Sequence, residues 1–158
     1  MNKKLVTGLF ASAMVLTMAF GACAEEGSTQ GTNTVVDGGT ELSLWTFQEL
    51  HVGFYTAMAD VWNEQFPDRP INLTVTSGQS TAMHQKLAIV CQSGDGAPDL
   101  ADIEIGHYGS FVTEGYLMPL NECVEPYKDD VVMSRIEMYG DTEGHWYGID
   151  FKFGETVT

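Results

Sequence analysis

Residues 92–115 read QSGDGAPDLADIEIGHYGSFVTEG, and their pattern predicts a helix end, a turn, a strand and the start of another helix. Gly94 and Gly96 can take the positive φ that ends a helix. Pro98 has a fixed φ and cannot continue a helix, so the chain enters the next segment in an extended conformation. The order predicts a change from helix to strand at Pro98.

A short apolar run follows the proline and predicts a strand that is covered on both faces. Its members are Leu100, Ala101, Ile103 and Ile105. Gly106 ends this run. Phe111 and Val112 then begin a helical pattern that stops at Gly115.

Two strands and two helices are predicted before this stretch. Residues 41–47 alternate as a strand, with Trp45 on the face opposite the leucines, and residues 48–52 form the loop after it. Residues 71–76 also alternate, and Ser80 or Thr81 can cap the helix that follows. The helices carry apolar side chains at helical spacing, at Phe54, Met58, Val61, Trp62 and Phe66, and at Met83, Leu87 and Val90. The β-α-β-α-β order predicts an α/β fold whose mostly parallel sheet has helices on both faces.

Shorter elements are predicted after Gly115. Asn121 is a candidate cap of a short helix, and residues 131–138 fit another helix. Residues 140–144 read as a turn. Residues 145–153 then run extended.

The motifs in this order resemble one family, the extracellular solute-binding proteins that deliver sugars to ABC transporters, the maltose-binding-like group. The matching residues are Ser93, Gly94, Asp95, Ala97, Pro98, Asp99, Gly115, Leu117, Pro119 and Leu120. Leu44-Trp45-Thr46 fits as well, and residues 144–149 resemble the family's G-x-x-Y-G-x-P hairpin, with Asp150 where Pro is usual. The resemblance runs from about Glu41 to the end of the chain.

The resemblance implies the first lobe of a type II periplasmic-binding-protein-like fold. Residues 41–148 would form this amino-terminal lobe, and residues 149–158 would begin the strand that crosses a hinge. A full member has two lobes and more than twice this length. We therefore expect the chain to be an amino-terminal fragment whose second lobe is missing, rather than a complete one-lobe protein.

The first 22 residues read as a lipoprotein signal peptide. A basic start at Lys3 and Lys4 precedes an apolar run, and Gly21-Ala22 lies directly before Cys23. Cys23 is the predicted lipidation site, which would anchor the protein to a membrane surface. Residues 23–40 are rich in Gly, Ser, Thr and Glu, and we predict a flexible tether there. A plain signal peptide and an uncleaved anchor are the alternatives.

Composition restricts the ligand. The chain of 158 residues has the length of one domain, and its 44% hydrophobic content is enough for a core. A formal net charge of −15 excludes a nucleic-acid surface, because phosphate binding needs clustered Lys and Arg. Neutral or cationic small molecules suit such a surface best.

Ligands of open α/β sheets bind outside the carboxyl ends of the strands, which makes Glu104, His107 and Tyr108 candidate contacts on and after the central strand. The resemblance implies that Trp45 on the first predicted strand and Glu49 in the loop after it contact the ligand as well. Gln79 in the loop before the second helix and Lys152 on the last extended run are further candidates. An acidic residue late in an apolar strand is costly unless it is solvated or paired, which makes Glu104 the leading candidate. Trp45 could be a core residue instead, and His107 could be structural.

Catalytic and metal motifs are absent from the sequence. It contains no G-x-S-x-G, H-E-x-x-H, P-loop or G-x-G-x-x-G, and its four histidines have no zinc-ligand spacing. We expect no enzyme activity, metal or cofactor. Cys91 and Cys123 could form a disulfide outside the cytoplasm, or remain two free thiols.

The function implied by the resemblance is that of a monomeric, lipid-anchored and extracytoplasmic binding protein. It would bind a mono- or oligosaccharide between two lobes and deliver it to the transmembrane subunits of an ABC permease. A binding protein for another solute, such as a polyamine or a metal chelate, is the first alternative. A surface-anchored carbohydrate-active enzyme is the second.

Overall fold

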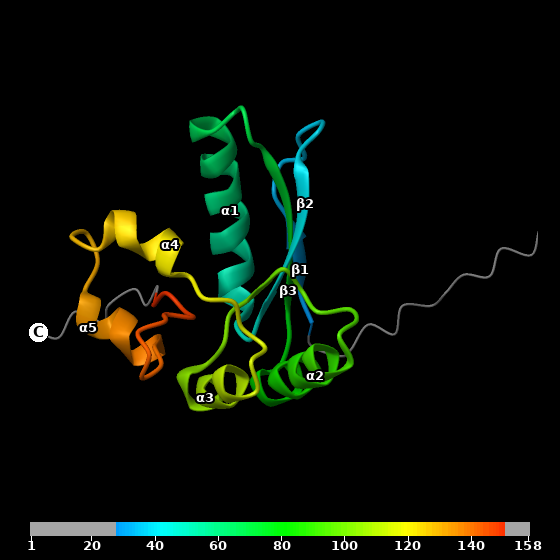
Figure 1. The fold of residues 1–158 in the computed structure, drawn as a ribbon. Helices are drawn as coiled ribbons and strands as arrows, with labels where there is room; N and C mark the ends of the chain where they lie inside the picture. Colours follow the sequence, from blue (N-terminus) through cyan, green and yellow to red (C-terminus); the bar gives the residue numbers. More distant parts are fainter. Residues whose placement is uncertain (1–27, 151–158) are drawn as a thin grey trace, which may run out of the picture.

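The computed structural model describes residues 28–150 and places four strands in one sheet (Figure 1). They are β1 (Gln30–Thr32), β2 (Thr40–Thr46), β3 (Ile71–Ser77) and β4 (Leu100–Ala101). Their order in the sheet is β1-β3-β2-β4. β2 pairs in parallel with β3 and β4, whereas β1 runs antiparallel to β3. The prediction of a mostly parallel sheet is confirmed.

Helices cover both faces of the sheet, as predicted. The longer ones are α1 (Glu49–Gln65), α2 (Ser80–Ser93) and α3 (Ile105–Thr113). Short segments follow, namely α4 (Asn121–Val124), the 3₁₀ turn η1 (Glu125–Tyr127), α5 (Met133–Ile136) and the 3₁₀ turn η2 (Glu137–Tyr139). Neighbouring residues of a strand point to opposite faces. Leu44 therefore packs with α1, and Trp45 packs with the side chains of α2 and α3.

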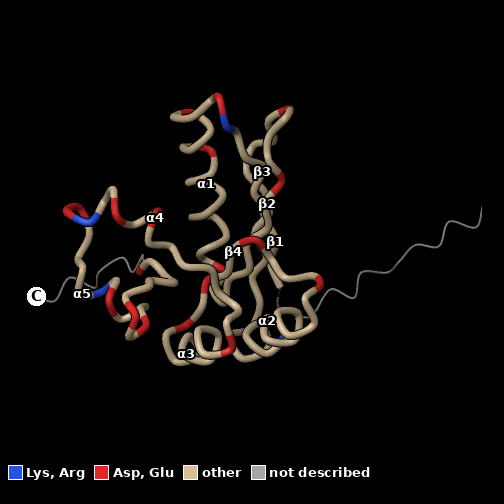
Figure 2. Tube along the Cα trace, in the orientation of Figure 1, with Lys and Arg blue, Asp and Glu red and all other residues tan. Residues whose placement is uncertain are grey.

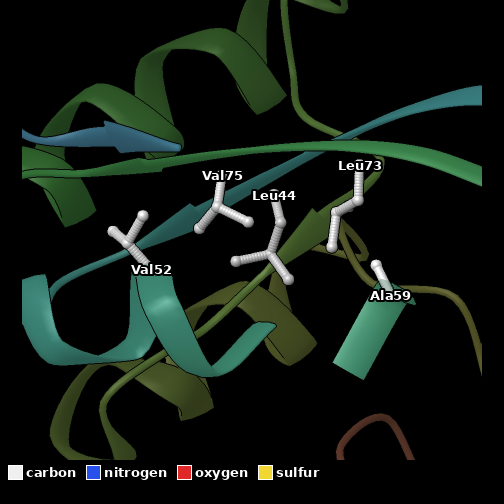
Figure 3. Packing of buried hydrophobic residues seen from close by; sticks show 5 residues of the cluster. All are labelled: Leu44, Val52, Ala59, Leu73 and Val75. Carbon is white, nitrogen blue, oxygen red and sulfur yellow. The ribbon is translucent and has the colours of Figure 1, made fainter. Parts of the chain in front are cut away.

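The first core cluster lies between α1 and the sheet, and Figure 3 shows its members directed toward one another. They are Leu44, Val52, Ala59, Leu73 and Val75. The predicted apolar face of α1 is wrong in part, because Met58 is 46% and Val61 is 38% exposed. The helix also begins at Glu49, inside the predicted loop. The small Ala59 faces the sheet and lets the helix approach it, an orientation that spacing alone does not fix.

The second core cluster lies on the other face and is built from Met83, Leu87 and Phe111. α2 begins after Gln79, which is its N-cap residue, so neither Ser80 nor Thr81 caps it. α2 ends as predicted, with Gly94 in the left-handed conformation at φ 73°. The stretch after it differs from the prediction. β4 has two residues, both exposed, and α3 begins at Ile105, so Gly106 lies in a helix.

The reason for the short strand is its place at the edge of the sheet. Pairing with β2 covers Leu44 to Trp45 only, and the Asp102 N–H then donates to the Trp45 carbonyl. Before the strand, the Asp99 carboxylate accepts the backbone N–H and the hydroxyl of Ser43, both at 2.8 Å. The Asp99 carboxylate thus takes the Ser43 N–H, which would otherwise be available for a further backbone hydrogen bond between the strands.

The predicted tether is wrong for its second half, because β1 adds to the sheet through backbone pairing with β3. A Cβ at Gly31 would lie 2.7 Å from Val52 Cγ1, so only glycine fits where β1 passes α1. The buried Asn33 amide accepts the Leu73 N–H and donates to the Ile71 carbonyl. Because β1 and Asn33 are held by hydrogen bonds and not by apolar side chains, this segment has no apolar periodicity from which a strand could be predicted.

The last described segment folds back on itself through an antiparallel bridge between Gly140 and Trp146. Asn121 is the first residue of α4 rather than its cap, and its amide holds the hairpin by accepting the Trp146 N–H and donating to the Gly144 carbonyl. Of the two alternatives for Cys91 and Cys123, the structure has the free thiols and not the disulfide. Cys91 packs beside the second core cluster on α2, whereas Cys123 is exposed on α4.

Acidic residues are spread over many elements, with few Lys or Arg between them (Figure 2). Within residues 28–150, none of the helices combines the length and the apolar character that crossing a bilayer requires.

Two residues on α2 test the packing of the second core cluster. We expect Leu87→Ala to lower the free energy of unfolding by about 2–5 kcal/mol, because Leu87 is 2% exposed and its loss leaves a cavity. Ile89→Ala on the same helix is the matched control, because Ile89 is 65% exposed and should change stability by less than about 0.5 kcal/mol. Urea unfolding of both variants measures this. Equal losses would contradict the assigned orientation of α2.

Candidate ligand-binding cleft

A cleft of about 770 Å³ opens where β2 and β4 end and α1 and α3 begin. It is also bordered by the segment before α4 and by the last described residues. The lining side chains used below are Phe47, His51, Tyr55, Asp99, Asp102, Glu104, Tyr108, Tyr139, Tyr147 and Asp150. The cleft thus lies at the carboxyl ends of parallel strands, the place where α/β sheets bind ligands.

Carboxyl groups and aromatic rings dominate the chemistry of the lining. Asp99, Asp102, Glu104 and Asp150 contribute carboxyl groups, and no Lys or Arg is found in the lining among residues 28–150. Asp150 forms an ion pair with Arg135, which stands outside the lining. Carboxylate oxygens accept hydrogen bonds from hydroxyl and ammonium groups, and aromatic faces cover apolar ring surfaces. The lining suits neutral polyols or cations.

A buried polar network forms one wall of the cleft. The Thr46 hydroxyl donates to Asp102 Oδ2 at 2.8 Å, and His51 Nδ1 donates to the same oxygen at 2.7 Å. The Gln48 N–H donates in turn to Thr46 Oγ1 at 3.2 Å. The Asp102 side chain is 7% and that of His51 is 26% exposed. Donors from two elements, β2 and α1, therefore fix one carboxyl group.

Tyrosine hydroxyls are held in their protonated form around this network. Burial raises the pKa of Tyr55, and the negative charge of Asp102 adds to the effect. Burial also raises the pKa of Tyr108 to about 12. The Tyr108 hydroxyl donates to the Tyr139 carbonyl, and the two rings meet edge to face with centroids 5.1 Å apart. These tyrosines are hydrogen-bond donors at neutral pH.

Glu104 is held from two sides at the rim of the cleft. The Ser80 hydroxyl donates to Glu104 Oε2 at 2.8 Å, and the Glu104 N–H donates to His84 Nε2 at 3.0 Å. His84 Nδ1 donates to the Ser80 carbonyl at 2.7 Å. His84 is thus neutral, with its proton on Nδ1, and burial lowers its pKa. The His107 ring stacks on the His84 ring at 4.2 Å.

Two groups of side chains have the spacing of metal ligands, and in each of them hydrogen bonds within the protein engage one central residue. In the group of His84, Glu104 and His107, both nitrogens of His84 bond to the backbone. In the group of Asp141, Glu143 and His145, Asp141 accepts bonds from two N–H groups, the His145 ring and the Tyr147 hydroxyl. These bonds lower the pKa of Asp141. Neither His84 nor Asp141 therefore needs a metal ion to satisfy its polar atoms.

The structure brings only some of the predicted contacts to the cleft. Glu104 and Tyr108 line it, and His107 lies beside Glu104 on the first turn of α3. Trp45 instead packs against the second core cluster, with Lys86 Nζ 4.9 Å from its ring centroid. Glu49 accepts the Thr29 hydroxyl, and Gln79 is exposed at the start of α2.

Lys152 and the lipidation candidate Cys23 lie outside the described residues. Sequence reasoning missed the network of Thr46, His51 and Asp102. The available signal was position, because Thr46 ends one parallel strand and Asp102 follows another, which places both at one edge of the sheet.

The chain is similar to proteins of one known family. The family of bacterial extracellular solute-binding proteins matches residues 48–150. An arabinooligosaccharide-binding protein from Halalkalibacterium halodurans is 41% identical over 136 residues, which are 85% of this chain and 30% of that protein. The arabinooligosaccharide-binding protein from Bacillus subtilis is 34% identical over 157 residues, which are 98% of this chain and 35% of that protein. The chain thus spans about a third of the length of these relatives.

A solved structure has the same fold. It is the galacto-N-biose-/lacto-N-biose I-binding protein of the ABC transporter from Bifidobacterium longum, in complex with lacto-N-biose. The two chains superpose with a TM-score of 0.55 at 25% sequence identity. The match covers 73% of this chain and 29% of that one, in keeping with a single lobe.

The neutral His84 makes stability depend on pH. Its pKa is lowered from 6.5 in the folded protein, so the unfolded chain binds a proton more readily. Its contribution is therefore complete above pH 6.5 and is lost as the pH falls toward the folded pKa. We expect the Tm of the wild type to fall more than that of His84→Gln between about pH 7.5 and 5.5.

Glutamine can keep both backbone bonds of His84 without titrating, which makes the variant a fair control. His145 contributes to the pH dependence of stability with the opposite sign, because its bond to Asp141 raises its pKa. Both proteins contain His145, so its contribution cancels when their Tm values are compared. Calorimetry at the two pH values measures the difference. Equal decreases in Tm would show that His84 does not carry this dependence.

Proposed function

The chain belongs to the family of bacterial extracellular solute-binding proteins, and we propose that it forms the amino-terminal lobe of a lipoprotein that binds a carbohydrate for an ABC importer. The cleft at the ends of β2 and β4 carries this proposal. Its open side would receive a second lobe, so that the ligand lies between the two. The protein would act by binding and delivery, without a chemical step.

The lining supports a neutral sugar. Sugar hydroxyls are hydrogen-bond donors that pair with the carboxyl groups of Asp102 and Glu104, and sugar rings have apolar faces that pack on tyrosine. The two curated relatives are arabinooligosaccharide-binding proteins. We infer an arabino-oligosaccharide as the ligand, bound by a monomer.

Closure would couple binding to transport. A sugar that contacts both lobes stabilises the closed state over the open one, which is a shift of population. The transmembrane subunits of the permease would recognise the closed form. The protein would be extracytoplasmic and held to the membrane by a lipid on Cys23, with residues 1–22 as the signal peptide.

A cationic solute such as a polyamine is a second candidate, because the lining combines four carboxyl groups with tyrosine rings. An ammonium group is attracted to carboxylates and to aromatic faces alike. The direct test below separates the two.

We expect the protein from its source cells to bind arabinotriose with a Kd between about 1 mM and 1 nM, and to bind spermidine and trigalacturonate much more weakly. Carboxyl groups without a cation in the lining repel the anionic sugar. Isothermal titration calorimetry with the three ligands measures this. Preferred binding of spermidine would establish the polyamine function, and preferred binding of trigalacturonate would contradict the charge argument. Turnover of arabinotriose would show an enzyme.

Glu104→Gln tests the leading sequence candidate at the rim. We expect the affinity for arabinotriose to fall about 10-fold, because an acceptor for ligand hydroxyls loses its charge. Glu114→Gln is the matched control, since Glu114 is exposed at the end of α3 and outside the cleft lining. Calorimetry measures both. An unchanged affinity in Glu104→Gln would show that the ligand does not contact Glu104 at the rim of the cleft.

Cys23→Ser tests the anchor. We expect the variant to appear in the soluble fraction, because serine cannot carry the thioether-linked lipid, whereas the wild type stays with the membrane. Immunoblotting of the two fractions measures the distribution, and Cys91→Ser serves as the control. Membrane retention of Cys23→Ser would point to an uncleaved apolar anchor.

A further inference from the structure

We propose that Asp102 determines the specificity of the cleft by presenting one fixed carboxyl oxygen to a ligand hydroxyl group, with Thr46 and His51 as its positioning residues. The inference rests on the proposed sugar-binding function. It assigns the recognition of one hydroxyl to a residue that no sequence motif singled out.

The register of the sheet places Asp102 on the wall of the cleft. Leu44 pairs with Leu100 and Trp45 with Ala101, so Thr46 and Asp102 are next in line on their strands. The Asp102 N–H donates to the Trp45 carbonyl at 2.8 Å and continues this pairing. Thr46 and Asp102 therefore lie side by side, and the first turn of α1 brings His51 to the same point.

The two oxygens of Asp102 have different surroundings. Oδ2 accepts the Thr46 hydroxyl and the His51 ring N–H, whereas no hydrogen bond to Oδ1 is found among residues 28–150. A buried polar atom without a partner is costly, and the described part of the chain has no such side-chain atom. Because Asp102 lines the cleft, we infer that Oδ1 accepts hydrogen bonds from water or ligand in the cleft.

A purely structural carboxyl group would not need this arrangement. Burying a carboxyl group costs free energy, and an apolar side chain of similar size is often no less stabilising. The observed arrangement instead fixes the direction of an acceptor before the ligand arrives, which reduces the entropy lost on binding. Hydroxyl donors fit this acceptor, and a ligand that lacks the hydroxyl leaves it unpaired.

Asp102→Asn is a sharp test because the two positioning groups both donate. Thr46 O–H and His51 N–H require an acceptor, so the amide oxygen of asparagine takes the place of Oδ2 and its NH₂ group faces the cleft. The variant keeps the size of the side chain and the buried bonds. It turns the acceptor in the cleft into a donor.

We expect Asp102→Asn to weaken arabinotriose binding about 10- to 100-fold while the Tm stays close to that of the wild type. Asp95→Asn, in the exposed turn after α2, is the matched control and should bind like the wild type. A set of monodeoxy methyl arabinosides completes the test. One deoxy analogue should bind more weakly than its parent to the wild type, yet equally with its parent to Asp102→Asn.

Substitutions at Thr46 test the role of Asp102 in a second way, because they leave its carboxyl group unaltered. Thr46→Val removes the donor and should weaken binding, whereas Thr46→Ser keeps the hydroxyl and should restore it. A merely structural role would change the Tm in both variants without changing the response to the deoxy analogues. Calorimetry gives the Kd and the Tm of both Thr46 variants, so the role of Asp102 can be tested even if Asp102→Asn fails to fold.

The outcomes separate the two proposals. If the wild type binds neither arabinotriose nor lacto-N-biose, the proposed sugar-binding function fails, and this inference fails with it. If the wild type binds a sugar but every deoxy analogue loses the same factor in wild type and Asp102→Asn, only the role of Asp102 is overturned. An unchanged Kd with a lowered Tm would assign Asp102 a structural role alone.

Discussion

The parallel pairing of β2 with β3 organises both the core under α1 and the edge of the sheet at which the helices begin. Seven residue pairs, from Thr40 with Ile71 to Thr46 with Ser77, are in register. The pairing brings Leu44, Leu73 and Val75 together under α1 and makes both strands end at one edge. Helices α1 and α2 both begin beyond that edge (Figure 1). The cleft exists there because parallel strands deliver successive loops to the same side of the sheet.

Polar residues inside this framework are held by complete hydrogen bonding rather than by apolar contact. Thr46 is fully buried, and His84 is 3% exposed. Each connects two elements, since Thr46 at the end of β2 bonds to Asp102 after β4, and His84 on α2 accepts the N–H of Glu104, the N-cap residue of α3. Buried polar groups are tolerated only when they are paired. The same bonds that satisfy the interior therefore also orient the acidic side chains in the cleft.

The cleft belongs to a chain that spans about a third of the length of its curated relatives, and it would form one side of the proposed binding site. Its carboxyl groups and tyrosine hydroxyls supply acceptors and donors without a countercharge from Lys or Arg in the described lining. A ligand rich in hydroxyl groups satisfies such a surface without importing charge. The solved relative with lacto-N-biose shows that a protein of this fold holds a disaccharide.

Local patterns in the sequence determined the strand and helix order, the helix end at Gly94 and the two-sided covering of the sheet, because these follow from periodicity and glycine chemistry. They also placed Glu104 and Tyr108 near the cleft. Tertiary structure alone decided that β1 pairs with β3 and that Trp45 faces the core. It also decided that Asp102 meets Thr46 and His51. The reason is that a carboxyl group finds its partners through strand register and helix placement, which join residues about 50 positions apart and leave no local pattern.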